Sequence, residues 1–186
     1  MIDRKWYEDY IERYRQALFE HDMLERCLEL KEWTSATKTN GGKLIFAGNG
    51  ASATIASHAA GDFTKQAGIP ATTFHDPGLL TMMSNDFGYE QCLAQCVDAF
   101  CHPKDLVVLI SSSGASKNML NAGEKVRNIG AKLVTFTGFE TSNPLKSLGD
   151  LNFWLPSRAY NIIENTHSIW LTTVIDMHVG SAEYSV

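Results

Sequence analysis

The stretch LVVLISSSGASKN, residues 106–118, passes from an apolar run into a loop of serines and then into a helical pattern. A second stretch, KLIFAGNGASATIASHAAGDF at residues 43–63, repeats this order of strand, small-residue turn and helix. Short apolar runs bounded by turn residues are typical of buried strands, and strands that alternate with helices are typical of a parallel sheet. The two stretches therefore predict an α/β fold.

Further apolar runs extend this pattern along the chain. The expected strands cover residues 43–48, 71–74, 106–110, 132–136 and 151–155, and the clearest expected helices cover residues 52–66, 89–100, 116–128 and 162–179. Strands separated by helices pair in parallel and are covered on both faces. We therefore expect a five-stranded parallel sheet between two layers of helices.

Two more helices are expected before the first strand. One carries an aromatic face, made of Tyr7, Tyr10, Ile11, Tyr14 and Leu18 at helical spacing. The other runs from Asp22, as its amino-terminal cap, to Ala36. The aromatic face needs a partner surface, which predicts a homo-oligomer. We treat residues 1–186 as one domain, with a helical pair at 1–37 and an α/β core at 43–186.

Composition narrows the class of protein. The 186 residues are 44% hydrophobic and carry a formal charge of -5, which indicates a packed globular chain with no broad positive surface for nucleic acid or an anionic membrane. No apolar run is long enough for a membrane span, and the first residues do not resemble a signal peptide, so we expect the cytoplasm. The four cysteines lack a CxxC spacing and are expected to be reduced thiols.

The first turn, Gly48-Asn49-Gly50-Ala51-Ser52, joins a strand to the start of a helix. Small residues there let backbone amides approach an anion, and the helix dipole favours negative charge. Two other interpretations stay open. Gly48-x-Gly50-x-x-Ala53 is a degenerate dinucleotide fingerprint without the acidic residue about twenty positions on, and a tight turn needs no ligand at all.

The second turn concentrates hydroxyl groups at a helix start. Capping the helix uses one or two serines, whereas this loop has four within six residues: Ser111, Ser112, Ser113 and Ser116. Their hydroxyls and the free amides of the first helical turn can all donate to phosphate oxygens. The loop therefore predicts a phosphate-binding site.

Three motifs, GNGASA, LLTMMSNDFGYE and SSSGASKN, occur in this order and spacing. Together they resemble the phosphoheptose isomerase branch of the sugar isomerase (SIS) superfamily. The resemblance implies a three-layer α/β/α sandwich around a five-stranded parallel sheet, assembled as a homotetramer with active sites at subunit interfaces. It also implies aldose–ketose isomerisation of sedoheptulose 7-phosphate, which supplies heptose for surface polysaccharide such as lipopolysaccharide or capsule.

The resemblance also assigns roles to individual residues. The phosphate binders correspond to Ser111, Ser112, Ser113 and Ser116. The sugar-binding positions correspond to Asn49 and Ser52 on either side of Gly50, and Asp86 corresponds to a carboxylate of the site.

The catalytic positions depart from the family pattern. His58 matches the first histidine of the family's His-x-x-x-Glu motif, but Asp62 stands where the family has glutamate. On a later helix, Glu164 stands in place of a glutamine and Thr172 in place of a histidine. We expect Asp62, Glu164 and His58 to act as the acid–base set, or to hold a zinc ion, since imidazole and carboxylate are acceptable zinc ligands. His167, three residues after Glu164, either joins this set or packs in the core.

Two functions are therefore expected from different classes. The first is a phosphosugar isomerase with no partners beyond its substrate and itself. The second is a non-catalytic sugar-phosphate-binding or regulatory SIS protein, similar to the SIS-fold partner of the bacterial replication initiator. A dinucleotide-dependent oxidoreductase is a third hypothesis, disfavoured by the missing acidic residue after the glycine turn. The other histidines are expected to be structural, with His75 the least certain because it follows a strand end, where ligand loops lie.

Overall fold

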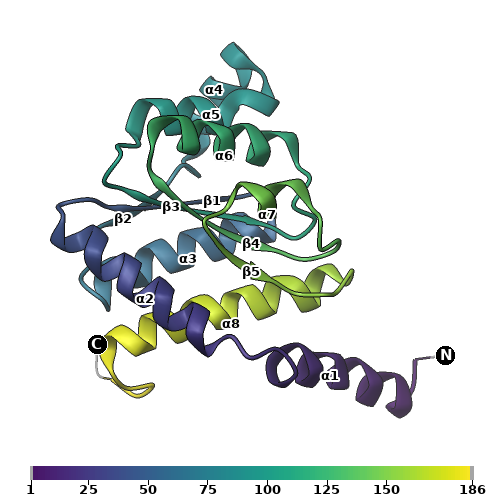
Figure 1. Ribbon diagram of the computed structural model, residues 1–186. Helices are drawn as coiled ribbons and strands as arrows, with labels where there is room; N and C mark the ends of the chain where they lie inside the picture. The colour runs from purple at the N-terminus through teal and green to yellow at the C-terminus, as the bar shows by residue number, and fades with distance from the viewer. Residues whose placement is uncertain (1, 185–186) are drawn as a thin grey trace.

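A computed structural model describes residues 2–184, which form eight helices and five strands (Figure 1). The strands are β1 (Leu44–Gly48), β2 (Ala71–Thr73), β3 (Leu106–Ser111), β4 (Lys132–Thr137) and β5 (Leu151–Trp154). They form one sheet in the order β2-β1-β3-β4-β5, and each neighbouring pair is parallel. The predicted five-stranded parallel sheet is confirmed.

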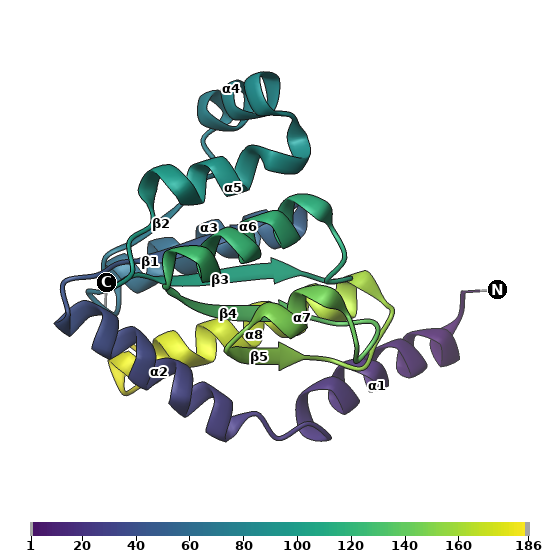
Figure 2. The ribbon, with the colours of Figure 1, turned by 45° about the horizontal axis from the view of Figure 1, so that its top comes forward.

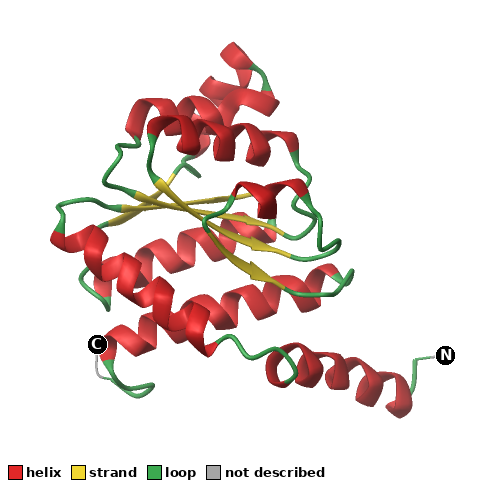
Figure 3. Ribbon diagram, viewed as in Figure 1, coloured by secondary structure: helices red, strands yellow, loops and turns green. Residues whose placement is uncertain are grey.

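Helices cover both faces of this sheet (Figure 3). They are α1 (Arg4–Phe19), α2 (Leu24–Thr39), α3 (Ala51–Lys65), α4 (Pro77–Phe87), α5 (Tyr89–Phe100), α6 (Lys117–Ile129), α7 (Pro144–Leu148) and α8 (Tyr160–Val179). One apolar core joins the sheet to α2, α3 and α8, and a second joins it to α5, α6 and α7. The three-layer α/β/α sandwich is confirmed.

The two cores explain why β1 is apolar throughout. Along β1, Leu44 and Phe46 enter one core while Ile45 and Ala47 enter the other, because successive side chains point to opposite faces. Phe46 stacks on Phe63 of α3, with ring centroids 5.6 Å apart. Full burial of such a side chain contributes about 1.5–3 kcal/mol to stability. Because β1 is covered on both faces, its sequence does not alternate between apolar and polar residues.

The amino-terminal helices differ in how much of their surface they bury. The sequence predicts Asp22 as the cap of α2, but Met23 occupies that position and Asp22 accepts a hydrogen bond from the Leu24 amide at 3.0 Å. α1 extends away from the sheet and reaches the rest of the chain at α8, where the Asn165 amide donates to the Tyr14 hydroxyl at 2.7 Å (Figure 1). Its aromatic face is only partly covered, since Tyr7 stays 59% exposed.

α4 and α7 are not among the helices predicted from sequence. Both have a proline in the first turn after a capping side chain: Asp76 accepts from the Leu79 amide, and Asn143 accepts from the Lys146 amide. α4 projects beyond α5, away from the sheet (Figure 2). None of the helices in residues 2–184 has the length and apolar character needed to cross a membrane.

The cysteines behave as predicted for structural thiols. All four, Cys27, Cys92, Cys96 and Cys101, are free and buried. Burial raises the pKa of the Cys27, Cys96 and Cys101 thiols to about 11, so these groups are neutral and unreactive at neutral pH.

The strand order defines where a ligand binds. From β1, the sheet extends to one edge through β2 and to the other edge through β3, β4 and β5. In open sheets of this order, ligands occupy the crevice outside the carboxyl ends of the two strands at which the order reverses, here β1 and β3. Gly48 pairs in register with Ile110, so the glycine loop after β1 and the serine loop after β3 begin side by side.

Candidate active site

The glycine loop, residues 48–50, is held tightly against the start of α3. A Cβ atom on Gly48 would lie 2.6 Å from the backbone carbonyl carbon of Ser52, so only glycine allows this approach. Gly50 occupies the cap position of α3 with φ at 55° and offers no side-chain cap. The first amides of α3 therefore lack a side-chain acceptor from the cap residue.

Asn49 is held by two side chains that the sequence analysis did not select. Its amide oxygen accepts from Asn118 of α6 and from the Tyr89 hydroxyl of α5, each at 2.9 Å. Its amide nitrogen donates to the Asn118 side chain at 3.0 Å. Since a primary amide has two N–H groups, one remains for a ligand. Asn49 thus fixes the loop to two helices as well as lining the site.

A cavity of about 330 Å³ opens beside this loop. Its polar lining comes from Asn49, Asn118, Tyr89 and His75, and its apolar lining includes Leu80, Cys92 and Leu93. His75, which was expected to be structural, contacts the glycine loop and Ser57 through its ring. Burial lowers the pKa of the His75 imidazole, which is therefore neutral at neutral pH.

The serine loop, residues 111–116, combines fixed backbone with available hydroxyls. Ser116 is the cap residue of α6 but its side chain makes no capping hydrogen bond, which leaves that hydroxyl for a ligand. Ser111 and Ser112 are largely buried, and Ser113 accepts from the Ala115 amide at 3.3 Å. Helix capping by its side chain therefore does not explain the serine at position 116.

Neighbouring segments hold the backbone of the serine loop. The Gly138 amide after β4 donates to the Ser112 carbonyl at 2.8 Å, and the Leu145 amide of α7 donates to the Gly114 carbonyl at 3.0 Å. Gly114 has φ at 63°, and a Cβ atom there would overlap the side chain of Asn143. The loop therefore has a fixed backbone and would not need to be ordered by a ligand.

Glu164 of α8 reaches the same loop. The Ser112 hydroxyl donates to its carboxylate at 3.5 Å, a long contact. Burial raises the pKa of Glu164, and the Ser112 hydrogen bond opposes this by lowering it. A half-buried carboxylate with a raised pKa is suited to moving protons, and it lies beside the predicted phosphate site.

A family model described as the SIS domain matches residues 7–138. The phosphoheptose isomerase of Thermodesulfovibrio yellowstonii is 34% identical over 170 residues, which cover 88% of this chain and 83% of that protein. The chain belongs to the phosphoheptose isomerase family.

Solved structures of the family share this fold. A phosphoheptose isomerase from Francisella tularensis matches with a TM-score of 0.89 at 24% identity, covering 97% of this chain and 100% of that one. The phosphoheptose isomerase from Neisseria gonorrhoeae matches with a TM-score of 0.83 at 25% identity, covering 94% and 96% of the two chains. The predicted resemblance to this family is therefore confirmed.

The histidine of the family's His-x-x-x-Glu motif and its carboxylate partner are neighbours here. The His58 Nε2 atom lies 3.0 Å from a carboxylate oxygen of Asp62, as i and i+4 positions on α3 predict. Asp62 is eleven residues into α3, about 16 Å along its axis, whereas Glu164 is four residues into α8, about 6 Å along. Both helices start at the carboxyl ends of the strands. Asp62 therefore lies farther from those ends than Glu164 does.

A single chain therefore does not bring the expected zinc ligands His58, Asp62 and Glu164 together. Within residues 2–184 no group of three or more His, Cys, Asp or Glu side chains is arranged to hold a metal ion. His58 and Asp62 meet, but Glu164 does not join them.

His167 packs in the core and does not enter the crevice. Its Nε2 atom bonds to the Thr137 carbonyl at 3.1 Å, and its ring lies edge-on to Phe136. Complete burial lowers its pKa to about 4, so the imidazole is neutral. Thr172, which replaces the family's histidine, bonds to the Ser168 carbonyl of its own helix at 3.0 Å. Neither residue supplies an acid or base in this chain.

The remaining predicted site residues are Ser52 and Asp86. Ser52 lies buried in the first turn of α3, beside the glycine loop, and its sugar-binding role stays a prediction. Asp86 lies on the exposed face of α4 and accepts from the neighbouring Asn85 amide at 2.8 Å. It does not line the cavity, and its role as a site carboxylate stays a prediction.

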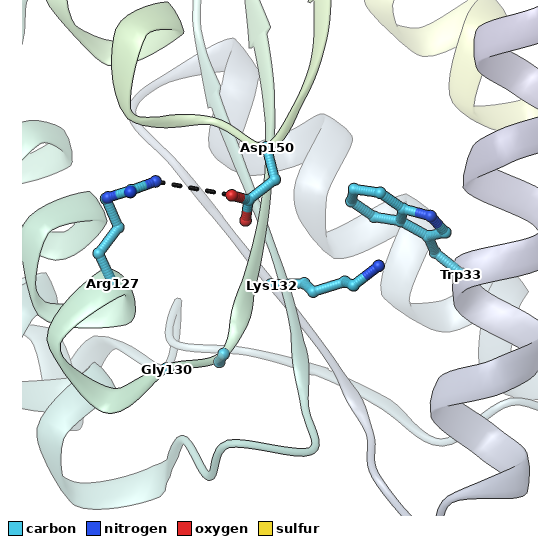
Figure 4. A pocket seen from close by; sticks show the side chains of 6 residues that line it. Trp33, Arg127, Gly130, Lys132 and Asp150 are labelled. Carbon is cyan, nitrogen blue, oxygen red and sulfur yellow. Dashed lines mark ion pairs between the residues drawn. The ribbon is translucent and has the colours of Figure 1, made fainter.

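A second hollow, of about 520 Å³, lies at the amino-terminal end of β4 (Figure 4). The Lys132 ammonium lies 3.7 Å from the ring centre of Trp33, and Arg127 pairs with Asp150 at 3.5 Å. Its charged groups thus already have partners. Because it lies where β4 begins, away from the carboxyl ends of the strands, we do not assign it to the reaction.

Proposed function

We propose that this protein is an aldose–ketose isomerase acting on sedoheptulose 7-phosphate or a closely related phosphosugar. The observation that carries the proposal is the placement of the glycine loop and the serine loop side by side at the carboxyl ends of β1 and β3. Membership of the phosphoheptose isomerase family supports the choice of substrate.

In this proposal the serine loop binds the phosphate. The Ser116 hydroxyl and the first amides of α6 donate to the phosphate oxygens, and the positive end of the α6 dipole favours its charge. The glycine loop then receives the sugar through Asn49, Gly50 and Ser52. Because the two loops share one crevice, a single extended sugar phosphate reaches both.

The isomerisation moves a proton between adjacent carbons through an enediol. It needs a base near the carbon that loses the proton and an acid near the sugar oxygens. Glu164 is our candidate base, since its carboxylate is half-buried and lies by the serine loop. His58 and Asp62 are our candidate proton-transfer pair, with the His58 side chain 59% exposed in the single chain.

We further propose a homo-oligomer, most simply a tetramer, with its sites at subunit interfaces. The exposed Trp6, Tyr7 and Ile11 of α1 give an apolar surface for a second copy. Such an arrangement lets His58 and Asp62 face the crevice of a neighbouring subunit. We place the protein in the cytoplasm, in heptose synthesis for surface polysaccharide; its four free cysteines suit a reducing compartment.

One observation favours the non-catalytic alternative. Thr172 replaces a histidine of the family and bonds only within α8. A regulatory SIS protein would keep the phosphate loop and lose this acid–base group. One assay distinguishes the two functions. It follows formation of the aldose 7-phosphate from sedoheptulose 7-phosphate by the purified protein. Product formation supports the isomerase, and binding of the sugar phosphate without product supports the regulatory protein.

A further inference from the structure

His75 lies next to the glycine loop because of the register of the sheet. β2 pairs with β1 so that Thr73 is opposite Phe46, and His75 and Gly48 each follow two residues later. The turn between β2 and α4 is fixed locally, since the His75 amide donates to the Thr73 hydroxyl at 3.1 Å. Asp76 then caps α4. The imidazole is therefore held in place before any ligand binds.

Both ring nitrogens of His75 are occupied by the protein. Nε2 lies 3.2 Å from the Gly48 carbonyl oxygen and 3.4 Å from the Gly48 amide nitrogen. Nδ1 lies 3.3 Å from the Ser57 hydroxyl of α3. The Ser57 hydroxyl also donates to the Ala53 carbonyl at 3.0 Å, so the tautomer that keeps every contact has Nδ1–H donating to Ser57 and Nε2 accepting from the Gly48 amide. No ring nitrogen is left to exchange a proton with a sugar.

We propose that His75 is a positioning residue for the proposed isomerase reaction, in which its ring fixes Gly48 relative to α3. Gly48 opens the loop whose next residues are predicted to receive the sugar, so a shift of Gly48 moves Asn49 and the first amides of α3 together. The serine loop has separate supports from β4 and α7. His75 thus acts on the sugar end of the site and not on the phosphate end.

Three substitutions test this assignment. His75→Leu removes both contacts, His75→Gln keeps an amide able to reach Gly48, and His75→Asn keeps one placed nearer Ser57. We expect His75→Leu to lower kcat by about tenfold or more while the affinity for inorganic phosphate changes by less than about twofold. We expect His75→Gln to recover most of the loss and His75→Asn to recover little. His102→Leu, an exposed histidine between α5 and β3, is the control.

Amide hydrogen exchange gives a readout that does not depend on activity. Residues 48–52 should exchange faster in His75→Leu than in the parent protein, with residues 111–116 unchanged. An unchanged rate at 48–52 overturns the proposal, as does unchanged kcat in folded His75→Leu or failure of His75→Gln to restore it. Equal losses of phosphate affinity and of sugar turnover overturn it too. If the parent protein itself shows no turnover, the proposed function fails, and the exchange rates alone decide the role of His75.

Discussion

The Ser112 hydroxyl lies 3.5 Å from the carboxylate of Glu164, which joins the serine loop to α8. This contact places a half-buried carboxylate beside the predicted phosphate site. Like charges repel, so the bound phosphate would itself disfavour the ionised form of Glu164. The same carboxylate is the one that burial already shifts toward a higher pKa.

Replacing Glu164 by glutamine should reduce turnover. Glu164→Gln keeps the shape of the side chain and removes its ability to accept a proton, for which we expect a loss of about 100-fold in kcat. The same change at Glu124, an exposed residue of α6, is the matched control and should have no effect. Full turnover in folded Glu164→Gln would remove Glu164 from the mechanism.

Removing the Ser112 hydroxyl should shift the pH dependence of kcat. The hydrogen bond from Ser112 lowers the pKa of Glu164, so Ser112→Ala raises that pKa further. If ionised Glu164 is the base, activity falls as pH drops through its pKa, and the acid limb of the profile therefore moves to higher pH in Ser112→Ala. An acid limb that stays in place or moves to lower pH contradicts this role.

Changing Ser113 and Ser116 to alanine should weaken binding of both the sugar phosphate and inorganic phosphate. A hydrogen bond to a charged group contributes about 1.5–3 kcal/mol, so loss of the Ser116 hydroxyl alone should lower the affinity by about ten- to a hundredfold. Calorimetric titration measures both ligands, with Ser35→Ala on the exposed side of α2 as the control. Unchanged affinity in the folded double variant would remove this phosphate site.

The layers of the fold were predictable because each strand is an apolar run that ends at a small-residue turn. The helices α4 and α7 were missed, although Asp76-Pro77 and Asn143-Pro144 are recognisable helix starts. Most of α4 lies within LLTMMSNDFGYE, residues 79–90, which the sequence analysis assigns to a family motif, and α7 has only five residues, too few for a periodic pattern.

The two loops of the site were also predictable, since small and hydroxyl residues follow apolar strands directly. Their supports were not, because Asn118, Tyr89 and His75 meet the glycine loop only once β1 lies between β2 and β3. Nor could helical spacing tell that His167 faces the core while Glu164, one turn earlier, faces the serine loop. That distinction depends on how α8 is rotated against β4.

The exposed face of α1 should mediate assembly. Light scattering at micromolar concentration should give a mass that is a multiple of the monomer's 20.6 kDa, with four copies expected. Because a buried unpaired charge is costly, Tyr7→Asp together with Ile11→Asp should give smaller species. Arg26→Asp on α2 is the control. A strictly monomeric parent protein would contradict the proposed interface.

Deuterium incorporation tests the isomerase proposal most directly. The purified protein, with its metal content defined, is incubated with sedoheptulose 7-phosphate in deuterated water, and exchange is followed at the carbon next to the carbonyl. Formation of an enediol requires that this carbon lose its proton to the enzyme, so we expect deuterium to appear there and to appear more slowly with Glu164→Gln. Tight binding of the sugar phosphate with no deuterium incorporated would contradict the proposal and leave a binding protein on an isomerase fold.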